Sequence, residues 1–141
     1  MSPEELVHRY VDAFNKRDIA AMHALYAEDA ITYDPQRSEP IKGWDGIEAA
    51  IRMQWTAFSD QRWALPRPVV ASGNRVAYEV AMQMTHDGPL PMPDGSTLEA
   101  TGTALSVEFS VFLTLDDDGL IAEERGYGDA TGIAVQLGLL G

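Results

Sequence analysis

The sequence contains no cysteine among its 141 residues, which excludes disulfides, thiolate nucleophiles and zinc–thiolate centres. It is also poor in positive charge, because 10 Lys and Arg stand against 22 Asp and Glu and the net charge is −12. Such a surface repels phosphate backbones and anionic lipid, so we expect no nucleic-acid and no membrane partner. No apolar run approaches the roughly 20 residues of a membrane span, and the N-terminus does not resemble a signal peptide. We therefore expect a cytoplasmic protein.

Sequence motifs for a metal or a cofactor are missing as well. The three histidines are far apart and form no pair at ligand spacing. Residues 116–119 (DDDG) lack the length and the terminal glutamate of an EF-hand, and they are typical of a hairpin turn. No glycine-rich phosphate loop is present. We expect neither a metal nor a cofactor.

The apolar periodicity places helices first and strands second. Helices are expected after the capping residues Ser2, Asp18 and Asp45. The long strand pattern near the end of the chain contains Gly102, where we expect a bend. Extended segments are predicted at residues 30–34, 61–71, 75–86, 97–115 and 120–129. Three helices followed by an antiparallel meander indicate one α+β domain over residues 1–141, with the helices on one face of a curved sheet.

Several motifs, in order along nearly the whole chain, resemble the SnoaL-like polyketide cyclase family. They are YVDAFNKRD at 10–18, YAEDA at 26–30, KGWDGI at 42–47, THDGPL at 85–90, DGLI at 118–121, YGD at 127–129 and QLGL at 136–139. The resemblance implies a cone-shaped α+β barrel, named after nuclear transport factor two, in which a curved antiparallel sheet packs on three N-terminal helices. It also implies a hydrophobic small-molecule ligand and a homodimer formed through the outer face of the sheet.

The chain departs from this family at the reacting positions. The acid that characterised cyclases carry near the end of the last strand falls on Gly126, and their partner histidine falls on Phe112. The related epoxide hydrolases place an acid at the same late position, so Gly126 argues against their chemistry too. If Phe112 and Gly126 face into the cone, alternation puts Glu108, Ser110 and Glu124 there with them and leaves an apolar outer face for a dimer. The pattern alone favours the reverse, with apolar residues inside and polar residues in solvent.

Under the first orientation, Glu108 and Glu124 lie at similar distances from the hairpin turn and approach each other across it. Two close carboxylates in a dry cone have at least one raised pKa, which suits a general acid or base near neutral pH. Two solvated surface acids, or an ion pair with Arg125 or Arg75, are the structural alternative.

Two further residues are candidates for the chemistry. His86 ends the middle strand, where it can stabilise an enolate oxygen or serve only as a loop histidine. Asp34 is a candidate base at the mouth of the cone, or a turn residue before Pro35. Gln83 could donate a hydrogen bond to a carbonyl oxygen. The side chains and positions expected to contact a ligand are Tyr33, Trp55, Tyr78, Gln83, Ser110, Phe112, Gly126 and Tyr127.

These observations predict a cofactor-independent enzyme that performs carboxylate acid/base chemistry beside a carbonyl, of the polyketide cyclase (aldol), isomerase or dehydratase type. One alternative is a protein that binds a hydrophobic ligand without reaction, because both usual reacting groups are missing. Another is an enzyme like the epoxide hydrolases with its acid placed differently.

Overall fold

The computed structural model describes residues 1–140 and has the expected order of elements. The helices are α1 (Pro3–Asn15), α2 (Ile19–His23), α3 (Trp44–Ala57) and α4 (Ala130–Gln136). The strands are β1 (Tyr26–Tyr33), β2 (Ile41–Lys42), β3 (Arg62–Ala64), β4 (Val70–Ser72), β5 (Arg75–Thr85), β6 (Leu90–Pro91), β7 (Thr97–Leu98), β8 (Ala104–Leu115) and β9 (Ile121–Gly128). The α+β prediction is therefore confirmed.

The main sheet is curved and mixed. Its order is β2-β1-β9-β8-β5-β3, with β4 paired to β5, while β6 and β7 form a separate hairpin. The predicted sheet was antiparallel throughout, but β1 and β9 run parallel. The single strand expected over residues 97–115 is divided into β7 and β8. Between them lies Gly102, at φ +70°, whose N–H donates to the carbonyl oxygen of His86 at 2.8 Å.

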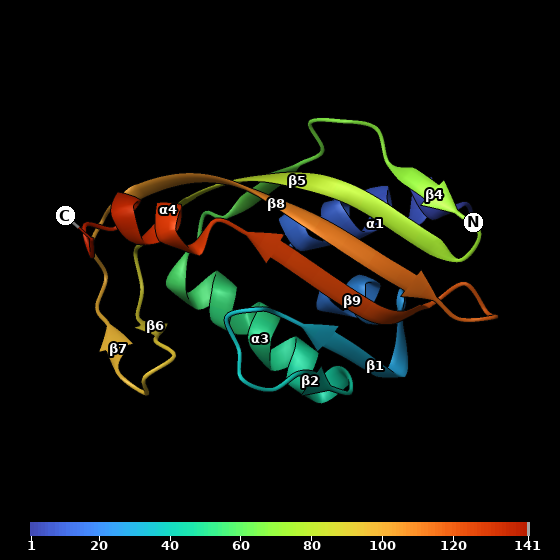
Figure 1. Ribbon diagram of the computed structural model, residues 1–141, viewed down its shortest axis with the longest axis horizontal. Coiled ribbons are helices and arrows are strands. Elements are labelled where there is room, and N and C mark those ends of the chain that lie inside the picture. Colours follow the sequence, from blue (N-terminus) through green and yellow to red (C-terminus); the bar gives the residue numbers. More distant parts are fainter. Residues whose placement is uncertain (141) are drawn as a thin grey trace.

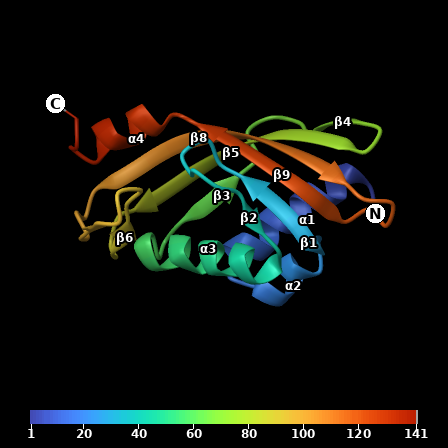
Figure 2. The ribbon, with the colours of Figure 1, turned by 60° about the horizontal axis from the view of Figure 1, so that its bottom comes forward.

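The first three helices cover the concave face of the sheet, as Figure 2 shows for α1, α2 and α3 below the strands. Helix α4 lies at one end of the sheet, beside β8, and continues from β9 (Figure 1). The expected cap at Ser2 is present, since its side chain accepts from the Glu5 N–H at 3.1 Å. Asp45 was expected to cap α3, but Gly43 is the N-cap and Asp45 lies in the first turn.

Alternation along β8 decides which face of the sheet is buried. Leu105, Val111 and Leu113 are buried, while Glu108 and Phe112 are exposed. The apolar row thus faces the helices, because each buried Leu or Val contributes about 1.5–3 kcal/mol when it leaves water. The expectation of an apolar outer face is wrong, and the outer face carries the polar stripe. Within residues 1–140, no helix has the length and apolar character needed to cross a bilayer.

Candidate active site

The carboxylate of Glu124 lies on the concave side of the sheet. In the ladders Glu124 pairs with buried Leu113 on β8 and with Thr32 on β1, which places all three residues on the inner face. The Tyr26 hydroxyl donates to the two carboxylate oxygens over distances of 3.2 and 3.3 Å. The hydroxyl oxygens of Tyr26 and Tyr10 are 2.8 Å apart. A chain of two phenols and one carboxylate therefore runs from α1 through β1 to β9.

Burial sets the electrostatics of this group. It raises the pKa of Glu124 to about 7, and the Tyr26 hydrogen bond opposes that rise. The pKa values of Tyr10, Tyr26 and Tyr78 are raised well above their usual range, first by burial and then by the nearby charge of Glu124. The three phenols therefore stay protonated near neutral pH. Glu124, which keeps some solvent-accessible surface, can gain or lose its proton in that range.

An aromatic cluster adjoins these phenols. Trp63 stacks on Phe14 with 3.7 Å between ring centroids, and the Tyr10 ring lies 5.7 Å from Trp63. Trp55, on α3, is 5.5 Å from Phe14. The Nε1 atoms of Trp55 and Trp63 are buried without a hydrogen-bond partner among the described residues. Because buried N–H groups usually have acceptors, these two donors are unusual for a protein interior.

Two glycines of β9 differ in the space above them. Gly126 pairs with buried Val111 and so faces inward, and a Cβ built on it would meet no atom within 4 Å. Gly128 also faces inward, but its Cβ would lie 2.6 Å from the ring of its partner Phe109. The inner face therefore has a gap over Gly126, with the Phe109 ring on one side along the strand and Glu124 on the other.

The predicted pair of Glu108 and Glu124 does not form. Glu108 pairs with Ala81 on the outer face, and its carboxylate lies 3.5 Å from Nη1 of Arg67. The placement of Glu108 inside the cone is wrong because a bulge follows Thr114 in the hairpin, and it shifts the register so that Glu108 and Glu124 have opposite orientations.

Several predicted ligand contacts also point outward. Phe112 and Tyr127 are 39% and 46% exposed, and their rings meet edge-on with centroids 6.0 Å apart. Tyr33 lies under the guanidinium of Arg125, 3.9 Å from the ring centroid, on the same outer side. The remaining predicted contacts found on the outer face are Gln83 and Ser110. Trp55, Tyr78 and Gly126 are the predicted contacts that lie on the inner side.

His86 is buried but distant from Glu124. It continues the inward row of β5, whereas Glu124 is aligned through Leu113 with Val76, ten residues earlier on β5. Ten residues span roughly 33 Å of strand, so the two side chains cannot share one reacting centre. Nδ1 of His86 accepts from the Thr101 N–H at 3.2 Å, and its Nε2 is buried without a hydrogen-bond partner within residues 1–140.

Asp34 lies closer to the acid, two residues beyond Thr32 at the end of β1. Its Oδ1 accepts from the Gln36 N–H at 2.9 Å, which is the turn geometry expected before a proline.

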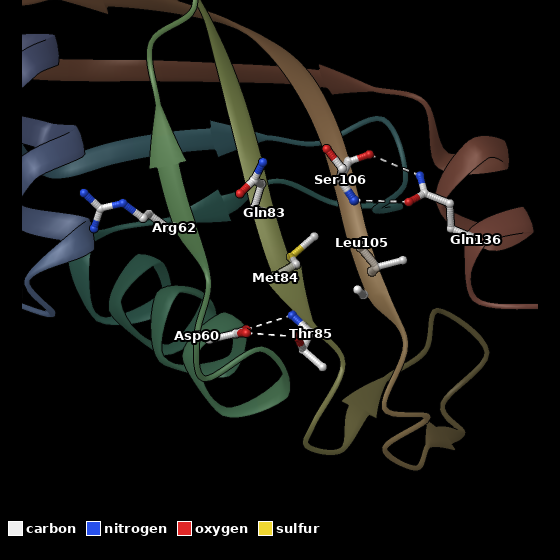
Figure 3. Close-up of a pocket in the computed structure, with 9 residues that line it drawn as sticks. Asp60, Arg62, Gln83, Met84, Thr85, Leu105, Ser106 and Gln136 are labelled. Carbon is white, nitrogen blue, oxygen red and sulfur yellow. Dashed lines mark hydrogen bonds between the residues drawn. The ribbon is translucent and has the colours of Figure 1, made fainter.

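A hollow with a volume of about 520 Å³ lies on the outer surface (Figure 3). Several of its polar groups are already engaged. Gln136 exchanges hydrogen bonds with the backbone of Ser106, at 3.1 and 3.3 Å, and Asp60 accepts from the N–H and hydroxyl of Thr85, at 2.7 and 2.9 Å. The lining residues are Asp60, Arg62, Gln83, Met84, Thr85, Ala104, Leu105, Ser106 and Gln136. These bonds stabilise the end of the sheet.

Tyr10, Tyr26 and Trp63 are not among the ligand contacts expected from the sequence. The two tyrosines occupy apolar helix and strand-entry positions, which are typical of core residues. A buried tyrosine nevertheless needs a partner for its hydroxyl, and that requirement was the available signal. Among residues 1–140 no group of three or more acidic or histidine side chains could hold a metal ion.

A known protein family matches most of the chain. The sequence model of the SnoaL-like domain matches residues 7–124. The chain belongs to the SnoaL-like family. No curated protein sequence matches it.

Solved structures share the fold of this SnoaL-like chain at low identity. A proposed SnoaL-like polyketide cyclase from Jannaschia sp. CCS1 is 17% identical, with a TM-score of 0.82 over 100% of this chain and 98% of the other. AclR, a proposed hydroxylase from Streptomyces galilaeus, is 21% identical, with a TM-score of 0.80 over 97% and 85%. A protein with a ketosteroid isomerase-like fold from Catenulispora acidiphila is 16% identical, with a TM-score of 0.77 over 99% and 96%. These names span different activities, so the fold alone leaves the chemistry open.

Proposed function

We propose that this SnoaL-like protein is a cofactor-independent enzyme that moves a proton beside the carbonyl of a hydrophobic small molecule. The observation that carries the proposal is the buried Glu124 carboxylate, held by Tyr26 and given a pKa of about 7 by burial. A base or acid works best when its pKa is near the working pH. Family membership supports the same reaction class, because relatives are named as proposed polyketide cyclases.

In the proposed step, the Glu124 carboxylate takes a proton from the carbon next to the carbonyl. The C–H bond breaks, an O–H bond forms on Glu124, and the electron pair moves to the carbonyl oxygen to give an enolate. In a cyclase, the enolate carbon then attacks a second carbonyl of the same molecule, and Glu124 returns its proton to the new alkoxide. In an isomerase, the proton returns to a different carbon. Neither route consumes an oxidant or a reductant.

The neighbouring groups have supporting roles in this proposal. Tyr26 fixes the carboxylate by its hydrogen bond, and Tyr10 supports Tyr26. The free Nε1 donors of Trp55 and Trp63 are candidates to stabilise the enolate oxygen, since preorganised donors in a dry site act strongly on developing charge. Asp34, at the end of β1, is a second candidate acid for the exchange of protons with solvent.

The test is turnover of a panel of ketones and diketones by the wild type, Glu124→Gln and the outer-face control Glu108→Gln. The rate kcat/KM should rise with pH through about 7, as expected for a base with this pKa. We expect Glu124→Gln to lose at least about a hundredfold in kcat, and Glu108→Gln to keep wild-type rates. Equal activity of all three proteins would contradict the proposed base.

A non-catalytic binding protein is the second candidate. It is favoured by Gly126, which stands where characterised cyclases have their acid and leaves open space instead. In that case no member of the panel turns over, but hydrophobic ketones still raise the melting temperature of the protein.

We also propose a homodimer through the outer face of the sheet. The exposed aromatic pair Phe112 and Tyr127 supports it, because exposed aromatic side chains on a broad sheet face are typical of interfaces. Sedimentation equilibrium would test it. The wild type should be dimeric at micromolar concentration, and Phe112→Ser should shift the equilibrium toward the monomer by about tenfold or more.

A further inference from the structure

Gly126 has no structural reason to be glycine. Its φ lies outside the left-handed region, so the backbone does not require a residue without Cβ. Crowding does not require it either, because among residues 1–140, its two chain neighbours aside, a Cβ would meet no atom within 4 Å. A glycine inside a strand loses side-chain packing, and it often marks a place where a ligand approaches the backbone closely.

The contrast with Gly128 sharpens this point. Both residues face inward from β9, but the Phe109 ring lies directly over Gly128, which accounts for that glycine by packing. Gly126 lies two residues away and is flanked by Val111 on β8. Two residues in the other direction is Glu124, with its carboxylate on the same face. The gap over Gly126 is therefore bounded by an aromatic ring, an aliphatic side chain and the candidate base.

We infer that Gly126 determines specificity. The apolar ring next to the acidic C–H of the substrate lies in the gap over Gly126, between the Phe109 ring and the Glu124 carboxylate. The inference rests on the proposed function and narrows its substrate to carbonyl compounds whose reactive carbon adjoins a ring. From Glu124 to Gly128 the strand extends roughly 13 Å, which accommodates a ring and the carbonyl beside it. Phe109 keeps some exposure, so its ring can contact a ligand.

The experiment fills the gap and measures binding. β-Tetralone, a bicyclic ketone with a C–H group between its carbonyl and its aromatic ring, is the probe, and its Kd is measured by calorimetry. The variants are Gly126→Ala and Gly126→Val, and the control Ala77→Val adds two methyl groups on the outer face of β5. Valine favours strands, and nothing occupies the space for its Cβ, so we expect Gly126→Val to fold. Should it fail to fold, Gly126→Ala carries the test.

The wild type should bind β-tetralone, and Gly126→Val should raise Kd by about tenfold or more, since single methyl-sized changes in apolar pockets have effects of that order. Gly126→Ala should give a smaller increase, and Ala77→Val none. Unchanged binding by Gly126→Val, or no binding by the wild type, overturns the inference. The two proposals fail separately. If binding depends on Gly126 but nothing turns over, the role of Gly126 in binding stands and the proposed enzyme is refuted. If turnover depends on Glu124 but not on Gly126, the proposed enzyme stands and the role of Gly126 is refuted.

Discussion

Replacing Glu124 by glutamine should make the stability of the protein less dependent on pH. The folded-state pKa of Glu124 is about 7, against an ordinary value of 4.5, because burial penalises the charged form. Between these two values the folded protein holds a proton that the unfolded chain has released. The contribution of Glu124 to the free energy of unfolding of the wild type therefore falls as pH rises from about 4.5 to about 7, and this contribution is constant on either side of that window.

The magnitude follows from the same two values. A rise in the pKa of Glu124 from 4.5 to about 7 changes its contribution to the free energy of unfolding by about 3 kcal/mol across the whole titration. About 2 kcal/mol of this change falls between roughly pH 5.5 and 9. These are upper limits, because Glu124 keeps some accessible surface and water offsets part of the burial. Glutamine cannot ionise and still accepts from the Tyr26 hydroxyl. The difference in Tm between Glu124→Gln and the wild type should therefore move by roughly 5 °C in favour of the variant as the pH rises across this range.

The assay is thermal unfolding followed by circular dichroism across that pH range, which stays above the pI of about 4.4. Glu123→Gln is the matched control. Glu123 is the adjacent residue of β9, but it faces outward and pairs with Arg125 at 2.6 Å. Its difference in Tm from the wild type should not change across the range. If the difference in Tm between Glu124→Gln and the wild type is also constant across the range, burial does not hold the proton on Glu124. That result would refute the reasoning.

Other changes test separate contacts. Tyr26→Phe removes the donor to Glu124 and the partner of Tyr10, so it should lower the free energy of unfolding by about 1–2 kcal/mol. It should also move the midpoint of the pH–rate profile upward, which kinetics from acid to alkaline pH would detect. Asp60→Ala removes the acceptor of both Thr85 donors, and denaturant titration should show a loss of about 1–2 kcal/mol with unchanged kcat. A downward movement of the midpoint in the first case, or a loss of kcat in the second, would contradict the assigned roles.

The fold could be predicted because its signals are local. The Ser2 cap, the apolar faces of α1 and α3 and the alternation of β5 and β8 each specify an element without reference to the others. The parallel pairing of β1 with β9 could not be found in this way. It joins segments about ninety residues apart in sequence, and no local pattern records which strand edge a returning chain meets.

The site was only half predictable for a related reason. In a strand each residue faces the side opposite to its neighbour, so an error of one residue in register exchanges the two faces. Counting from the hairpin turn placed Glu108 beside Glu124, but the bulge between Thr114 and Leu115 adds one residue to β9 and breaks that count. Glu124 therefore turns inward while Glu108 meets Arg67 on the outside.

Burial then separates two glutamates that the sequence could not distinguish. Solvent and an arginine accompany Glu108, whereas Glu124 has phenol groups for neighbours and a pKa of about 7. The family resemblance of the sequence places the acid of the cyclases at Gly126, two residues further along the same inward row. A carboxylate moved by two residues stays on the same face, so the strand can keep an acid in the cone while leaving a gap at the usual position. The chemistry proposed for Glu124 and the specificity proposed for Gly126 thus both depend on the inward row of β9.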